Sequence, residues 1–96
     1  MLLWQKVRQD MMADKDFAEY SEEMQVAADI AKAIMELRMT NGWTQKELAK
    51  RAGVSQADIS RYENMEKLPN VATLKKIAAA GNCALRVRFE VVGKDN

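Results

Sequence analysis

Apolar side chains recur every three or four residues along most of this chain, which is the spacing of a helix with one buried face. Between residues 22 and 39, six such positions share one face: Val26, Ala27, Ile30, Ala33, Ile34 and Leu37. Asn41 and Gly42 follow, and these residue types end helices because they tolerate a left-handed backbone. The pattern therefore predicts a long, core-facing helix over residues 22–39.

Two helix start signals lie in the centre of the chain. Thr44 is a favoured N-cap residue, and Glu47 follows three positions later, where its carboxylate can reach back to the cap. Ser55 and Asp58 repeat this arrangement. Gly53 lies between them, where the chain must reverse and a positive φ costs glycine little. We expect two short helices, one starting at each cap, joined by a tight turn.

The last third of the chain changes its period. Residues 71–80 keep helical spacing between Asn70, a favoured N-cap residue, and Gly81, which we expect to terminate the helix. After Gly81 the period becomes two, and four apolar residues share one face of a predicted strand: Leu85, Val87, Phe89 and Val91. A lone strand leaves backbone groups unpaired. We therefore expect it to pair with its twin in a homodimer, or with the sheet edge of another protein.

The first 22 residues predict an amphipathic helical arm. Trp4 and Val7 have helical spacing, and Phe17 and Tyr20 repeat it further on. We expect these apolar side chains to be buried against another surface. The arm either folds back on its own domain or docks as a helix in the groove of a partner protein, and the residues alone favour neither.

A chain of 96 residues, 48% of them apolar, is long enough for one compact domain and too short for two. We divide it into an arm (residues 1–22), a helical domain (residues 23–82) and a strand segment (residues 83–96). It contains no run of eighteen apolar residues and no secretory stretch, so we expect a soluble, cytoplasmic protein without a membrane segment. Cys83 is alone and histidine is absent, which favours a small buried Cys83 and no disulfide, zinc site or other cofactor.

Charges of opposite sign are segregated along the chain. Residues 10–29 carry seven acids against Lys15 alone, whereas residues 44–88 carry nine basic residues against four acids. The basic segment suits a polyanion, and the acidic one suits a basic partner, although an acidic run is more often a solvated face. No phosphate loop or supported carboxylate pair is visible, so no enzyme is expected.

Residues 45–64 resemble the helix-turn-helix of phage Cro and repressor proteins, the XRE family, with Ala49, Gly53 and Ile59 at the small, turn and core positions. The alternative is a pair of solvated helices in an ordinary bundle, which the two start signals and this spacing disfavour. The resemblance implies a mainly α, lambda-repressor-like helix-turn-helix bundle that binds double-stranded DNA, with the N-terminal helical arm and the C-terminal β-strand appended.

The resemblance also implies an ion pair between Arg38, near the end of the first long helix, and Glu63, at the end of the reading helix. Two exposed charges would contribute almost nothing to stability. A partly buried pair would pin the reading helix to the first helix. We expect a structural role in either case.

In the second helix of the motif, Ile59 and Tyr62 share one side, and by position in the family the other side contacts base edges: Gln56, Ala57, Ser60 and Arg61. Glutamine suits adenine, arginine suits guanine or phosphate, and alanine suits the thymine methyl group. Five further residues are candidates for the DNA backbone: Thr44, Gln45, Ser55, Asn64 and Lys67. Asp58 opposes the phosphates, so we expect it to cap the helix rather than contact cytosine.

A wider resemblance covers nearly the whole chain. The arm, the XRE domain and the terminal Leu-Arg-Val-Arg-Phe strand together resemble HigA-type antitoxins of bacterial toxin–antitoxin pairs. This implies a homodimer that represses its own operon at an inverted repeat, and a small basic, mRNA-cleaving toxin of the RelE/HigB type as partner. The candidate toxin contacts lie in the arm: Trp4, Val7, Phe17 and Tyr20. The alternative is a stand-alone XRE repressor whose arm packs on its own core.

Overall fold

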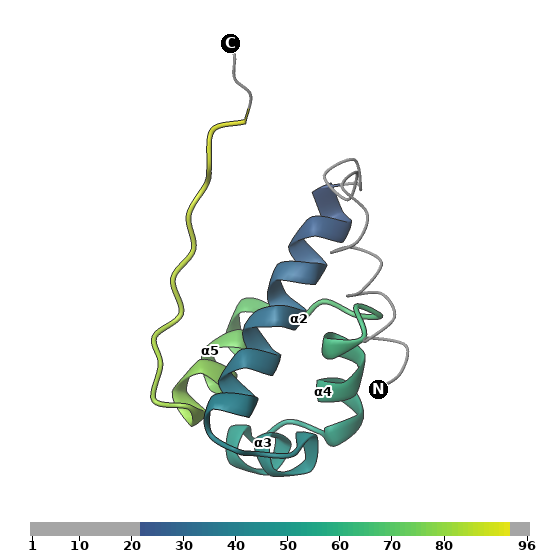
Figure 1. The fold of residues 1–96 in the computed structure, drawn as a ribbon, viewed down its shortest axis with the longest axis vertical. Coiled ribbons are helices and arrows are strands. Elements are labelled where there is room, and N and C mark those ends of the chain that lie inside the picture. The colour runs from purple at the N-terminus through teal and green to yellow at the C-terminus, as the bar shows by residue number, and fades with distance from the viewer. Residues whose placement is uncertain (1–21, 93–96) are drawn as a thin grey trace.

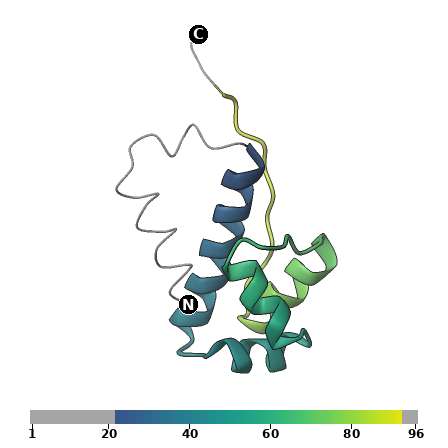
Figure 2. The ribbon, with the colours of Figure 1, turned by 90° about the vertical axis from the view of Figure 1, so that its right-hand side faces the viewer.

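The computed structural model describes residues 22–92 of the chain, and this part forms four helices (Figure 1). They are α2 (Glu22–Thr40), α3 (Gln45–Ala52), α4 (Gln56–Glu63) and α5 (Val71–Ala80). Figures 1 and 2 both place α3 at the base of the bundle, below the end of α2. The expected mainly α bundle is confirmed. Residues 1–21 of the predicted arm, with all four candidate toxin contacts, lie outside the described residues, and Glu22 begins α2.

The start signals form as the sequence indicates. The Thr44 hydroxyl accepts the backbone N–H of Glu47 at 3.0 Å, and the Ser55 hydroxyl accepts that of Asp58 at 3.0 Å. Gly53 ends α3 with φ 72°, in the left-handed region that glycine tolerates. The carboxylates do not reach back to the caps, however. Glu47 instead accepts a hydrogen bond from Arg51 one turn later, at 2.7 Å, because that cation attracts it more strongly than a neutral N–H.

The predicted face of α2 is confirmed in part, since Ala27 and Ile34 are buried and Ile30 and Leu37 pack against the core. The most buried positions of α2 are alanines, Ile34 and a methionine: Ala27, Ala28, Ala31, Ile34 and Met35. Val26 is 46% exposed, and Ala33 is exposed as well. The helix α4 packs against α2, and small side chains at the contact let two helix backbones approach closely. The pattern of apolar residues alone could not show which of two adjacent faces meets α4.

Gly81 follows α5 for a different reason from the one expected. Its φ is −95°, which any residue can adopt, and the left-handed residue is Asn82, with φ 60°. A Cβ on Gly81 would lie 2.6 Å from Cγ of Leu37, far inside van der Waals contact. Glycine is therefore needed here because the last turns of α2 pack directly on the backbone after α5.

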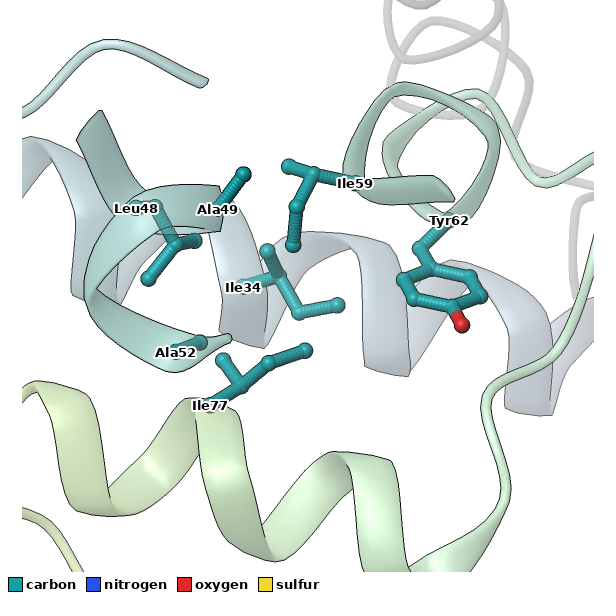
Figure 3. Close-up of a cluster of buried hydrophobic side chains, with 7 residues drawn as sticks. All are labelled: Ile34, Leu48, Ala49, Ala52, Ile59, Tyr62 and Ile77. Carbon is teal, nitrogen blue, oxygen red and sulfur yellow. The ribbon is translucent and has the colours of Figure 1, made fainter. Parts of the chain in front are cut away.

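The core joins all four helices (Figure 3). Its buried members are Ile34, Leu48, Ala49, Ala52, Ile59, Tyr62 and Ile77. Trp43 and Val54, the residues before the two caps, are half-buried against this cluster. Such contacts fix the angle at which the chain enters each helix. The helix-turn-helix is thus held by its own core residues and by α2 and α5 behind it.

A second, smaller cluster supports the loop after α4. Met65 packs against Ala31 and Met35 of α2. Its backbone has φ 63°, which is unusual for a residue with a side chain and costs free energy. The loop after α4 therefore combines an unfavourable backbone angle with favourable burial of one methionine.

The C-terminal segment forms no strand in the described part of the chain, which corrects the expectation. Residues 83–92 are extended and leave the bundle (Figure 1). Leu85 is half-buried, but Val87, Phe89 and Val91 are 74%, 98% and 100% exposed. A strand needs a neighbouring strand for its backbone hydrogen bonds, and no described residue supplies one.

Cys83 is exposed rather than buried, because it lies where the chain leaves the bundle. Within residues 22–92, no helix combines the length and apolar character needed to cross a membrane. The same residues hold no group of three or more acidic, cysteine or histidine side chains placed to bind a metal ion.

Candidate nucleic-acid interface

The two short helices α3 and α4 form a helix-turn-helix, and α4 has a buried and an outer side. Ile59, Tyr62 and Glu63 are buried on the inner side. On the outer side Gln56, Ala57 and Arg61 are exposed and Ser60 is half-buried. The four candidate base contacts therefore lie together on the surface of one helix, which we call the recognition face.

An ion pair holds α4 from behind. Arg38 Nε donates to Glu63 Oε2 at 2.8 Å, and Nη2 donates to Oε1 at 3.1 Å. The Glu63 side chain is completely buried, and that of Arg38 is 13% exposed. The expected pair is thus confirmed, in its buried and bidentate form. Such a pair fixes orientation as well as distance, because two parallel hydrogen bonds must align.

A third residue completes the network, and sequence reasoning missed it. Gln45 Nε2 donates to Glu63 Oε1 at 2.9 Å, and Arg38 Nη1 donates to the Trp43 carbonyl at 3.1 Å. Both Glu63 oxygens are therefore hydrogen-bonded, as a buried carboxylate requires. The network links α2, the start of α3 and the end of α4. Gln45 is a candidate contact to the DNA backbone, and one of its two amide hydrogens is already donated to Glu63 within the protein.

The other candidate phosphate contacts surround the recognition face. Thr44 and Ser55 are exposed at the N-termini of α3 and α4, where backbone N–H groups favour anions. Asn64 ends α4, with its side-chain Nδ2 directed to the Ser60 hydroxyl at 3.5 Å, while its Oδ1 is buried without a hydrogen-bond partner. Lys67 lies in the next loop and is half-exposed.

Asp58 binds two basic side chains of this surface. Arg61 Nη1 and Lys67 Nζ lie 3.2 Å and 3.4 Å from the same oxygen, Asp58 Oδ1. Partial desolvation would raise the pKa of Asp58, but the hydrogen bond and charge of Lys67, followed by those of Arg61, together hold it below its ordinary value. The two cations therefore favour the ionised form of this carboxylate. Its side chain was expected to cap α4, and it instead joins the helix to the following loop.

On the outer surface of α3, Arg51 also makes two contacts, one with an aromatic ring and one with a carboxylate. The Arg51 guanidinium lies over the Trp43 ring, 4.5 Å from its centroid, while also bonding to Glu47. The Trp43 ring and the Glu47 carboxylate both restrain the Arg51 side chain. Trp43 is therefore restrained on one side by the core and on the other by Arg51.

The sequence of this chain is similar to those of known helix-turn-helix proteins. The model of the helix-turn-helix family HTH_3 matches residues 34–87, which include α3, the turn, α4 and α5. Antitoxin HipB of Escherichia coli K12 is 46% identical over 48 residues, which are 50% of this chain and 54% of that protein. Antitoxin HigA1 of Mycobacterium tuberculosis H37Rv is 32% identical over 85 residues, 88% of this chain and 57% of that protein.

This chain spans about half the length of these curated relatives. Among solved structures, a chain of the HipA-HipB-O2-O3 complex is similar with a TM-score of 0.55 and 34% identity. The similarity covers 73% of this chain and 92% of that one. The sequence and the fold are thus both similar to those of helix-turn-helix proteins that include HipB.

Proposed function

The chain belongs to the helix-turn-helix family HTH_3, and on that premise we propose that it is a sequence-specific, DNA-binding transcriptional regulator of the XRE type. The observation that carries the proposal is the recognition face of α4, held from behind by the buried pair of Arg38 and Glu63. A rigid helix that presents glutamine and arginine side chains to solvent suits the major groove of B-DNA.

The recognition face supplies the base contacts in this proposal. Gln56 makes a bidentate contact to adenine, and Arg61 does the same to guanine. Ala57 touches a thymine methyl group, and Ser60 contributes its hydroxyl. Each good pair contributes about 1–3 kcal/mol of discrimination against the wrong base.

The surrounding residues contact the phosphates and set the register. The hydroxyls of Thr44 and Ser55 accept backbone N–H groups as caps and keep their own hydrogens for a phosphate. The Gln45 amide keeps one hydrogen after its bond to Glu63. Asn64 and Lys67 reach phosphates beyond the end of α4. These contacts carry no sequence information of their own.

The exposed C-terminal segment supports a homodimer as the DNA-binding form. Residues 84–92 make no backbone–backbone hydrogen bond with another described residue and carry an apolar side, which a second copy in antiparallel pairing would cover. Its apolar contacts are Leu85, Val87, Phe89 and Val91. Two recognition helices about 34 Å apart would then read an inverted repeat.

We further propose that the chain is the antitoxin of a toxin–antitoxin pair of the HigBA/RelE type. The 85-residue similarity to HigA1 is longer than the helix-turn-helix and supports this role. The acidic residues 10–29 suit a small basic, mRNA-cleaving toxin. Trp4, Val7, Phe17 and Tyr20 of the arm cover the toxin, while the dimer represses its own operon. The alternative is a stand-alone repressor without a toxin.

DNA binding is tested by fluorescence anisotropy with labelled duplexes tiled over the chain's own promoter, against a random-sequence duplex of equal length. We expect one tile to bind more tightly, and Arg61→Ala to lose about tenfold of that preference. Lys76→Ala, which removes an exposed charge on α5, is the control and keeps the preference. If no tile is preferred, the proposed regulator function is wrong.

The antitoxin role is tested by co-expression with the product of the neighbouring small open reading frame. We expect a complex that co-purifies and stops mRNA cleavage. Arg61→Ala should keep this complex, whereas Trp4→Ala should weaken it and spare DNA binding. Equal loss of both activities in Arg61→Ala rejects this division of labour. Promoter binding without any complex leaves a stand-alone repressor.

A further inference from the structure

One acidic side chain lies between Arg61 of the recognition face and Lys67 of the following loop. Asp58 Oδ1 accepts from Arg61 Nη1 at 3.2 Å and from Lys67 Nζ at 3.4 Å. The other acid of α4, Glu63, is buried on the opposite side of the helix. In the free protein, a single carboxylate therefore holds two of the cations proposed to contact DNA.

Helix capping does not require this carboxylate. The cap of α4 is the bond from the Asp58 backbone N–H to the Ser55 hydroxyl, and any residue except proline at position 58 supplies that N–H. An acid in the first turn also stabilises the helix through a favourable interaction with its dipole. An acid close to DNA phosphates, however, repels them and weakens DNA binding. A residue that opposes DNA binding and is not needed as a cap calls for another role.

Resting on the proposed function, we propose that Asp58 is a specificity-determining positioning residue, which orients Arg61 toward base edges and withholds Lys67 charge from non-specific DNA. Arginine has five N–H donors, and Asp58 engages one nitrogen, Nη1, so the rest of the guanidinium is free for guanine. Asp58 itself acts on the bases only through Arg61.

The restraint affects operator and random DNA differently. An unrestrained arginine reaches phosphates on any sequence, whereas a restrained one has already lost much of its conformational freedom before it meets the correct base. The Asp58 charge also repels phosphates on every sequence. The carboxylate therefore weakens binding to random DNA, and at the operator the ordered Arg61 offsets this loss.

The test compares Asp58→Asn with Glu66→Gln. Both changes remove one negative charge next to α4, but Glu66 is exposed and makes no ion pair with any described residue. The probes are the preferred promoter duplex and a random-sequence duplex of equal length, each titrated over a series of salt concentrations. Circular dichroism checks that each variant is folded.

For Asp58→Asn we expect tighter binding to the random duplex, with a slope of log affinity against log salt that is steeper by about one. The ratio of promoter to random affinity should fall by about tenfold. For Glu66→Gln both affinities should rise together, which leaves the ratio unchanged.

Two outcomes overturn the inference while the wild type still prefers its promoter. If Asp58→Asn weakens binding to both duplexes equally, Asp58 has only a structural role. If it strengthens both equally, as Glu66→Gln does, Asp58 acts only through its charge. A wild-type chain with no promoter preference is a different result, since it overturns the proposed function and this inference with it.

Discussion

At the scale of single residues, the carboxylate of Glu63 is buried away from water. A charge without water is costly, and three hydrogen bonds from Arg38 and Gln45 compensate for it here. The pair was implied by family resemblance, but its burial and the third donor were not predictable, because both depend on how α2, α3 and α4 meet in space.

Arg38→Met should destabilise the fold by about 3–5 kcal/mol, because it leaves the Glu63 charge buried without its main partner. The double variant Arg38→Met, Glu63→Met should recover most of this loss, since apolar side chains of similar size are tolerated there. Urea unfolding followed by circular dichroism measures both. A double variant that is no more stable than Arg38→Met would show that the buried charge is not the cause.

Met65 offers a second test at this scale. With φ at 63°, a residue without a Cβ is favoured, but the methionine side chain also packs on Ala31 and Met35. Both Met65→Ala and Met65→Gly lose the packing, and only glycine relieves the backbone. We expect Met65→Gly to be more stable than Met65→Ala by about 1 kcal/mol in thermal unfolding. The reverse order would mean that the backbone angle is not strained.

At the scale of elements, the helix caps and turns could be predicted from the sequence, whereas the contacts between helices could not. The caps Thr44, Ser55 and Asn70 and the turn at Gly53 depend on residues within one turn, and the predicted helices formed there. The buried face of α2 was misassigned at Val26, because several apolar faces of that helix compete. The Asp58 ion pairs were also missed, since they require the path of the loop after α4.

The contact between α2 and the end of α5 is testable by a mutant cycle. Gly81→Ala should destabilise the fold by about 1–3 kcal/mol, because the new methyl group overlaps Leu37 rather than because of φ. In a Leu37→Ala background the same change should cost almost nothing. Equal costs in both backgrounds, measured by denaturant unfolding, would exclude the clash with Leu37.

At the scale of the whole molecule, the bundle and the C-terminal segment have different requirements. Four helices bury a shared core within one chain. The segment over residues 83–92 leaves Phe89 and Val91 in solvent. The period of two in its apolar residues predicted a strand, and none forms within residues 22–92, because no described residue supplies a neighbouring strand for its backbone hydrogen bonds.

The double variant Val87→Asp, Phe89→Asp should therefore convert the proposed dimer to a monomer in sedimentation velocity. Charges on the covered side would have to be desolvated in the dimer. Promoter affinity should fall by about a hundredfold or more, because two linked half-sites become independent. Arg86→Ser, on the alternate side of the segment, is the control and should remain dimeric. A variant that stays dimeric would place the interface elsewhere.

The most direct test of the central claim, that α4 reads base edges in the major groove, is methylation protection of guanine N7 on the preferred promoter duplex. The wild-type chain should protect guanines in two symmetric half-sites about one helical turn apart. Arg61→Ala should expose one guanine in each half-site and leave the others protected. Full protection that is unchanged by Arg61→Ala, or no protection in the major groove, would contradict the claim.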